Sequence, residues 1–201
     1  HVYAVTLSAE LSGSYNSAIL AREMFMEEQR GKKCHVFNSR SASVGETLIA
    51  LRIQQLEEQR IPFEQLVELV EEYIDTQHTY FVLDNLDTLR KNGRLSKVKA
   101  FVASALKIKP IMGSTPEGNI AQLDQTRGSN RALVKMTELV IAGVEPGQRR
   151  LAAISHCNCP ERAEIVRAAL ASHLMLEDIL VLPTAGVSSM YANDGGVIVV
   201  I

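Results

Sequence analysis

A stretch of small hydroxyl side chains near the start of the chain has the composition of an anion-binding loop: "LSAELSGSYNSA", residues 7–18. It follows an apolar run and precedes a helical pattern, so it joins a strand to a helix. The first amides of a helix lack partners within the helix, and the helix dipole favours negative charge there. Ser12 and Ser14 add hydroxyl donors, and Gly13 lets a ligand approach the backbone closely. The simpler alternative is that Ser14 caps the helix and Gly13 serves a tight turn.

The spacing of this loop separates it from two common phosphate-binding motifs. It lacks the G-x-x-x-x-G-K-[ST] spacing of a P-loop, and it lacks the G-x-G-x-x-G fingerprint of a Rossmann dinucleotide site. The sequence therefore predicts a site for a small anion, with no nucleotide implied.

A second candidate for anion binding is Arg94, in "LRKNGRLS" at residues 89–96. Asn92-Gly93 is a strong turn signal, which places Arg94 just after the end of a helix. An arginine can bind a carboxylate with two parallel hydrogen bonds. The alternative is a surface cation that only favours the helix end.

Other reactive side chains do not form a known catalytic or metal motif. His156, Cys157 and Cys159 lie close together in "SHCNCPER", but zinc sites use C-x-x-C spacing and four ligands. We therefore expect no metal, and a helix that starts at Cys159-Pro160. The chain lacks a G-x-S-x-G elbow, so an enzyme would need an acid or base near Ser12, with Asp84 or His156 as candidates.

These candidates need strands and helices to position them, and the apolar pattern predicts two arrangements. The first part reads as strand, helix, strand, two helices and strand, which predicts a parallel sheet covered on both faces. The expected strands are 2–7, 34–37 and 80–83, and the expected helices are 15–28, 43–59 with a capping box of Ser43 and Glu46, and one from Pro62. The second part predicts a short helix before Asn92, a helix at 97–106, a hairpin at 107–124, helices at 129–142 and 160–174, and strands at 150–155, 179–183 and 195–201.

The predicted fold class is α/β in two domains. Residues 1–105 are expected to form a parallel-sheet α/β domain, and residues 106–201 an α+β domain with a mostly antiparallel sheet.

Composition excludes several classes of protein. The 201 residues are 46% hydrophobic and 22% charged, which is typical of a globular protein. The net charge of −2 and the scattered basic residues argue against binding of nucleic acid. The chain has no apolar run of transmembrane length and no signal-peptide pattern. Three cysteines indicate a reducing compartment, so we expect a cytoplasmic protein.

Several segments together resemble the DegV family of bacterial proteins. "SAELSGSYNSA" resembles the signature S-x-x-L-S-G-T-Y-x-S-A, and "NSRSASVGE" is similar to D-S-x-x-x-S-x-G. "FVLDNLDTLRKNGRLS" resembles F-x-x-x-x-L-x-x-L-x-x-G-G-R-I-S. "LKIKPIM", "EGNI" and "TRGSNRAL" follow in the order of L-K-I-K-P-I-L, D-G-x-I and R-T-x-x-x-A-L. The order and spacing agree over most of the chain.

The resemblance implies a two-domain protein of the EDD fold that buries one long-chain fatty acid, such as palmitate, stearate or oleate, and has no other cofactor. Ser12, Gly13, Ser14 and Arg94 would hold the carboxylate, an apolar tunnel would hold the acyl chain, and Arg127 and Asn193 would stand behind the head group. The partner would be a fatty acid kinase, separate or fused, that phosphorylates the carboxylate. The protein itself would be a carrier without catalytic residues.

The sequence departs from the family pattern at several places. The family's first strand with an Asp-Ser pair and a Thr-Ser loop would precede His1, so we expect the N-terminal part of the first domain to be missing. Within the signatures, Ser14 replaces Thr, Asn38 replaces Asp, Asn92 replaces Gly, and Asn193 stands at about the place of a His. Two alternatives stay open: an enzyme acting on a small anionic metabolite at the same loop, and a regulatory domain without a ligand.

Overall fold

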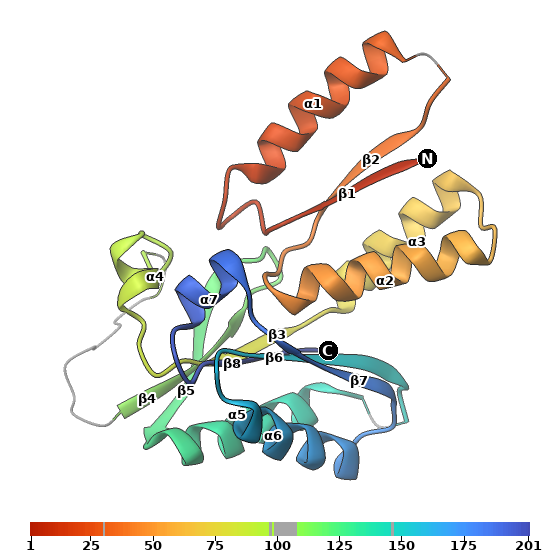
Figure 1. The fold of residues 1–201 in the computed structure, drawn as a ribbon. Coiled ribbons are helices and arrows are strands. Elements are labelled where there is room, and N and C mark those ends of the chain that lie inside the picture. Colours follow the sequence, from red (N-terminus) through yellow and green to blue (C-terminus); the bar gives the residue numbers. More distant parts are fainter. Residues whose placement is uncertain (30, 97, 99–107, 146) are drawn as a thin grey trace. The chain divides into compact units, whose positions relative to one another are not determined.

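The structure is a computed structural model that describes residues 1–29, 31–96, 98, 108–145 and 147–201. The chain forms two compact units, coloured along the sequence in Figure 1. The first unit contains His1–Gln77 and Pro116–Asn119, and the second contains His78–Thr115 and Ile120–Ile201. The predicted domain boundary near residue 105 lies outside the described residues, as does the predicted helix at 97–106 apart from residue 98.

The first unit is built on two parallel strands, as predicted for this part of the chain. β1 (Val2–Thr6) pairs with β2 (Cys34–Asn38), with Val5 opposite Phe37. Figure 1 shows α1 on one side of this pair and α2 and α3 on the other. The bounds of the helices are Ser14–Glu28 for α1, Val44–Glu58 for α2 and Phe63–Thr76 for α3.

The core of the first unit lies between the strand pair and the helices α2 and α3. Leu66, Val70 and Ile74 of α3 recur at helical spacing and are buried, together with Phe37 and Ile49. The same spacing, read from the sequence, predicts this buried side. The apolar spacing in residues 15–28 likewise predicts a packed face on α1 that includes Met24, but this prediction is wrong for Met24, which is 66% exposed.

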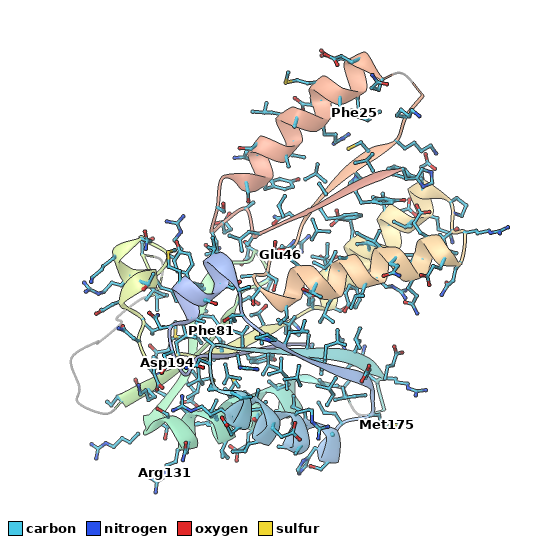
Figure 2. All side chains as sticks on the ribbon, in the orientation of Figure 1. Phe25, Glu46, Phe81, Arg131, Met175 and Asp194 are labelled. Atoms are coloured by element: carbon cyan, nitrogen blue, oxygen red, sulfur yellow. The ribbon has the colours of Figure 1, made fainter. Side chains whose placement is uncertain are left out.

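The start of α2 contains half of the predicted capping box. The half-buried Glu46, labelled in Figure 2, lies in the first turn, and its carboxylate is hydrogen-bonded to the backbone of Ser43. Burial raises the pKa of Glu46, and this hydrogen bond only partly opposes the rise. The Ser43 side chain makes no capping bond, and its φ of 58° places the residue outside the usual N-cap conformation.

The second unit is built on a mixed sheet with the strand order β5-β4-β3-β8-β6-β7. Among the described residues, β6 and β7 are parallel and the other neighbours are antiparallel. The predicted hairpin and the mostly antiparallel sheet are therefore confirmed. The strands are β3 (Thr79–Val82), β4 (Ile108–Ser114), β5 (Ile120–Arg127), β6 (Arg150–His156), β7 (Leu176–Pro183) and β8 (Val197–Val200).

Among the described residues of this unit, two helices cover one face of the sheet and two shorter helices lie elsewhere. α5 (Ser129–Gly143) and α6 (Pro160–His173) lie along one face in Figure 1. Buried side chains of both helices, such as Met136 and Leu170, pack against Ile154 and Val199 of the sheet. The shorter helices are α4 (Asp87–Lys91) and α7 (Gly186–Ala192).

The structure differs from the sequence prediction at β3 and at α7. We predicted β3 as the third strand of the parallel sheet, but it pairs antiparallel with β4 and β8. All four of its residues are buried, so its apolar sequence does not indicate which strands pair with it or in which direction. α7 was not predicted, because Gly, Val and two Ser residues give "GVSSMYA" little helical propensity.

Candidate functional site

The predicted anion-binding loop, residues 7–13, joins the end of β1 to the start of α1. We call it the serine loop. Gly13 is the N-cap of α1, and Ser14 is the first helical residue, so the alternative in which Ser14 caps the helix is wrong. Ser12 Oγ accepts a hydrogen bond from the Ser14 amide at 3.2 Å. The Ser12 hydroxyl therefore lies at the helix start, where amide donors and the helix dipole favour an anion.

The local structure does not require residue 13 to be a glycine. Its φ of −70° is ordinary for any residue, and no described heavy atom beyond Gly13 and its two chain neighbours lies within 4 Å of the position that a Cβ would take. The space in front of the backbone at Gly13 is open, as the approach of a ligand requires.

Two further side chains hold the serine loop in place. Asn38, at the end of β2, accepts hydrogen bonds from the amides of Ala9 (3.0 Å) and Arg40 (3.2 Å) at its Oδ1. The Asp of the family signature offers the same kind of acceptor, so its replacement by Asn keeps this function. Ser8 is fully buried and is the first residue of the family signature. Ser8 is not among the site residues predicted from the sequence, although its place in the signature was a usable signal.

Arg94 follows the end of α4 in the second unit, as the Asn-Gly turn predicts. Its amide donates to the Leu89 carbonyl at 2.9 Å, and Gly93 has a φ of 74°. Asn92 Nδ2 donates to the Thr88 carbonyl at 2.8 Å, and the Asn92 carbonyl accepts a hydrogen bond from the Arg94 guanidinium. The half-buried Arg94 side chain is thus held at this turn.

Arg127 and Asn193 also belong to the second unit. Arg127 is the exposed last residue of β5. Asn193 follows α7 with φ 56° and ψ 171°, a conformation that few residues other than glycine adopt. Its Nδ2 donates to the carbonyls of Asn85 (3.2 Å) and Tyr191 (3.0 Å). That the serine loop, Arg94, Arg127 and Asn193 form one site stays a prediction.

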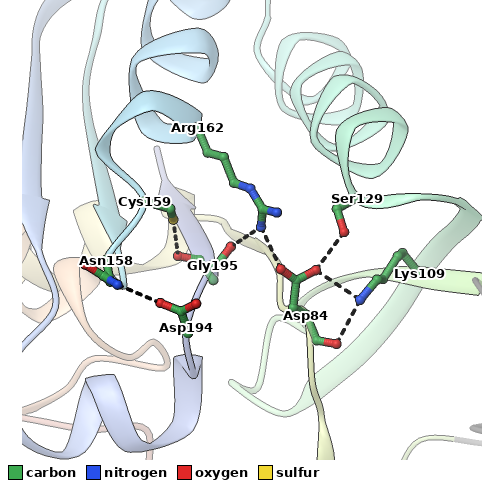
Figure 3. Close-up of polar contacts among 9 residues, drawn as sticks. Asp84, Lys109, Ser129, Asn158, Cys159, Arg162, Asp194 and Gly195 are labelled. Atoms are coloured by element: carbon green, nitrogen blue, oxygen red, sulfur yellow. Dashed lines mark hydrogen bonds and ion pairs between the residues drawn. The ribbon is translucent and has the colours of Figure 1, made fainter.

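Asp84 lies at the centre of a polar cluster in the second unit, drawn in Figure 3. Its carboxylate accepts hydrogen bonds from Ser129 Oγ (2.6 Å) and Arg162 Nη1 (2.8 Å). It also lies 3.0 Å from Lys109 Nζ. Burial by itself would raise the pKa of Asp84, but the hydrogen bonds from these three side chains and the Lys109 charge hold it at about 2. Asp84 therefore stays ionised, which makes it a poor proton donor or acceptor for the enzyme alternative.

The other partners of this cluster could not be found from the sequence. Arg162 Nη1 also donates to the Gly195 carbonyl at 2.7 Å. Ser129, Arg162 and Gly195 come from three separate segments, and no local spacing connects them with Asp84.

The cysteine-rich segment 155–162 serves as a strand end and a helix start. His156 Nδ1 accepts a hydrogen bond from the Cys159 amide at 3.3 Å, and α6 begins at Pro160 as predicted. Within the described ranges, no group of three or more His, Cys, Asp or Glu side chains could hold a metal ion.

A comparison with protein families decides the relationship of the chain. The family model described as "Uncharacterised protein, DegV family" matches residues 1–201. The chain belongs to the DegV family. A DegV domain-containing protein of Streptococcus pneumoniae is 34% identical over 200 residues, which cover 98% of this chain and 70% of that protein.

Solved structures of DegV proteins share the fold. A DegV family protein from Ruminococcus gnavus, refined with vaccenic acid, is 57% identical with a TM-score of 0.94, over 99% of this chain and 71% of that chain. The Streptococcus pneumoniae Fatty Acid Kinase (Fak) B3 protein, loaded with linoleic acid, is 30% identical with a TM-score of 0.87, over 98% of this chain and 70% of that chain. The α/β fold of this chain is therefore the fold of DegV proteins that carry fatty acids.

The described part of this DegV chain has no helix that is both long and apolar enough to span a bilayer.

Proposed function

We propose that this DegV protein binds one long-chain fatty acid. The observation that carries the proposal is the likeness to the Ruminococcus gnavus protein, which is 57% identical and was refined with vaccenic acid. The linoleic acid in the Fak B3 protein supports the same class of ligand. Both ligands combine one carboxylate with a long unbranched acyl chain.

The proposed site for the carboxylate is the start of α1, with Arg94 as the counter-charge. The Ser12 hydroxyl lies at the helix start, and the space at Gly13 is open. Ser14 lies at the same helix start with an exposed side chain. A carboxylate placed there would gain hydroxyl donors, the positive end of the helix dipole and a guanidinium. Arg127 and Asn193 are proposed to stand behind this first set of groups.

The acyl chain is proposed to lie in an apolar tunnel. Each methylene removed from water contributes about 0.8 kcal/mol, so a long chain supplies most of the binding free energy. The main role of the head-group site is then selectivity for a carboxylate, and its contribution to the binding free energy is smaller.

The proposed biochemical role is that of a carrier that presents the fatty acid to a fatty acid kinase. The name of the similar Streptococcus pneumoniae protein connects a DegV fold with such a kinase. In this role the kinase would transfer phosphate to the carboxylate, and the carrier would supply binding without catalytic residues. The lowered pKa of Asp84 supports this role, because a carboxylate that stays ionised is a poor acid or base for catalysis.

Extraction of the bound ligand tests the proposal. The protein is purified from a lipid-rich host, extracted with organic solvent and analysed by mass spectrometry. We expect about one long-chain fatty acid per protein. The proposed function is contradicted if the purified protein contains no fatty acid and the delipidated protein also fails to bind added oleate.

A further inference from the structure

Ser8 is a fully buried polar residue whose hydrogen bonds reach into the serine loop. Its Oγ donates to the Gly118 carbonyl at 2.8 Å and accepts a hydrogen bond from the Glu10 amide at 3.3 Å. Its carbonyl accepts from the amides of Leu11 (3.0 Å) and Ser12 (3.1 Å). Ser8 thus accepts hydrogen bonds from three amides in the first turn of the loop, one of which is the amide of Ser12.

The partner of the Ser8 hydroxyl is the turn Pro116–Asn119 between β4 and β5, which belongs to the first unit. Gly118 has a φ of 88° and approaches the loop closely. A Cβ on Gly118 would lie 2.4 Å from Ser8 Oγ and 2.8 Å from Arg40 Cα. The turn therefore leaves no room for a side chain, and its backbone carbonyl meets Ser8 directly.

The backbone of Ser8 is anchored from a third direction. Its amide donates to the Ser41 carbonyl at 3.0 Å, in the segment that follows β2. The end of β1, the segment after β2 and the turn Pro116–Asn119 therefore converge on one residue. The two Oγ bonds, to the Gly118 carbonyl and from the Glu10 amide, are the parts of this arrangement that depend on a side chain.

We infer that Ser8 is a positioning residue for the carboxylate site, which acts by holding Ser12 at the start of α1 through the turn that both residues share. The inference rests on the proposed function. Ser8 does not touch the ligand: its hydroxyl is used by Gly118 and Glu10, and its carbonyl by Leu11 and Ser12. Loss of the Oγ anchor would free the turn and move the Ser12 hydroxyl relative to the helix start, while the acyl chain would keep its contacts.

A positioning role for Ser8 predicts that its loss changes the selectivity for the carboxylate. Oleate and oleyl alcohol have the same hydrocarbon chain, but only oleate has a carboxylate. The ratio of their affinities measures the head-group site alone. Delipidated protein is titrated by displacement of a dansyl-labelled fatty acid, with each compound in turn. We expect Ser8→Ala to lower the affinity for oleate about tenfold, the equivalent of one lost hydrogen bond, and to leave the affinity for oleyl alcohol unchanged.

A double-mutant cycle separates positioning from general destabilisation. If Ser8 acts through Ser12, Ser8→Ala adds little to Ser12→Ala, and the two effects on the oleate ratio are not additive. Thr137→Ala serves as the control, because Thr137 Oγ1 is also a buried hydroxyl with a backbone partner, the Leu133 carbonyl at 2.9 Å, but belongs to α5 of the second unit. We expect the control to leave the ratio unchanged.

The outcomes distinguish the inference from the function beneath it. Equal losses for oleate and oleyl alcohol in Ser8→Ala, or additive effects with Ser12→Ala, overturn the positioning role while the fatty-acid function stands. A wild-type protein that binds neither compound overturns the proposed function itself. If Ser8→Ala does not fold, Ser8→Cys carries the same comparison, because its thiol is a weak donor of similar size and should give an intermediate ratio.

Discussion

Asp84 keeps its negative charge because its neighbours compensate for burial. Desolvation disfavours the carboxylate, but Ser129, Arg162 and Lys109 stabilise it and hold its pKa at about 2, below the usual value near 3.8. A group whose pKa is depressed by folding stabilises the folded state above its unfolded pKa, and that contribution is lost as the pH falls toward the folded pKa. The shift corresponds to at most about 2 kcal/mol at neutral pH, and solvent screening of the partly exposed carboxylate reduces this contribution.

The first prediction concerns this charge. Asp84→Asn should lower the free energy of unfolding by about 1–2 kcal/mol at pH 7, and the difference from wild type should shrink between about pH 4 and pH 2. Urea denaturation at both pH values measures the effect. Asp124→Asn is the matched control, because Asp124 pairs with Lys135 at 2.7 Å near the surface and should contribute much less. An equal loss for the two variants would contradict the compensation described for Asp84.

The second prediction concerns Gly13, where a methyl group meets no protein atom within 4 Å. Gly13→Ala should leave the empty protein as stable as wild type, or more stable by about 0.4–1 kcal/mol, because alanine restricts the unfolded chain. It should weaken oleate binding roughly tenfold, because the new Cβ enters the proposed carboxylate space. Thermal denaturation and oleate titration measure the two effects, with Ser17→Ala on α1 as the control. Unchanged oleate affinity would remove Gly13 from the site.

Among the elements, α3 and α1 differ in how they are packed. Leu66 of α3 is fully buried, whereas 61% of Leu20 on α1 is exposed. Both helices belong to the first unit, so the two leucines allow a comparison at equal side-chain size.

The third prediction uses this pair. Leu66→Ala should lower the free energy of unfolding by about 2–5 kcal/mol, since it loses buried contacts and leaves a cavity. Leu20→Ala should change it by no more than about 0.5 kcal/mol. Both values come from urea denaturation followed by circular dichroism. Similar losses for the two substitutions would mean that α1 is covered in solution.

The elements that the sequence predicted well are those with a local signal. Alternating Lys and Ile in residues 107–111 and the turn sequence TPEGN at 115–119 favour the hairpin, and Pro160 favours the start of α6. β3 carries no such signal for its partners, since its four buried residues would suit a parallel or an antiparallel neighbour. The Asp84 cluster could not be predicted at all, because long-range packing alone brings Asp84 and Arg162 together.

For the whole molecule, the proposed ligand is expected to add stability to the folded state. A ligand that binds only folded protein stabilises it by RT ln(1 + [L]/Kd), about 2.7 kcal/mol at a hundred times Kd. Family signatures predict the class of ligand. The sequence does not predict the distance between the serine loop and Arg94, because the loop belongs to the first unit and Arg94 to the second.

The fourth prediction follows from this linkage. Oleate at about a hundred times its Kd should raise the Tm of delipidated protein by roughly 5–10 °C. Ser12→Ala should reduce the shift, and acetate should produce none, because it lacks an acyl chain. Differential scanning calorimetry measures all three. A shift with acetate as large as that with oleate would favour an enzyme for a small anionic metabolite.

The position of β8 sets the order in which the second unit can be completed during synthesis. β8 lies between β3 and β6, although it follows all the other described strands in the sequence. The ribosome therefore releases β3, β4 and β5, and then β6 and β7, before the strand that joins them exists. Until residues 197–200 emerge, β3 and β6 each present an unpaired edge, which is open to pairing with another chain or to capture by a chaperone. Closure of the sheet has to wait for the most distant contacts, which slows folding.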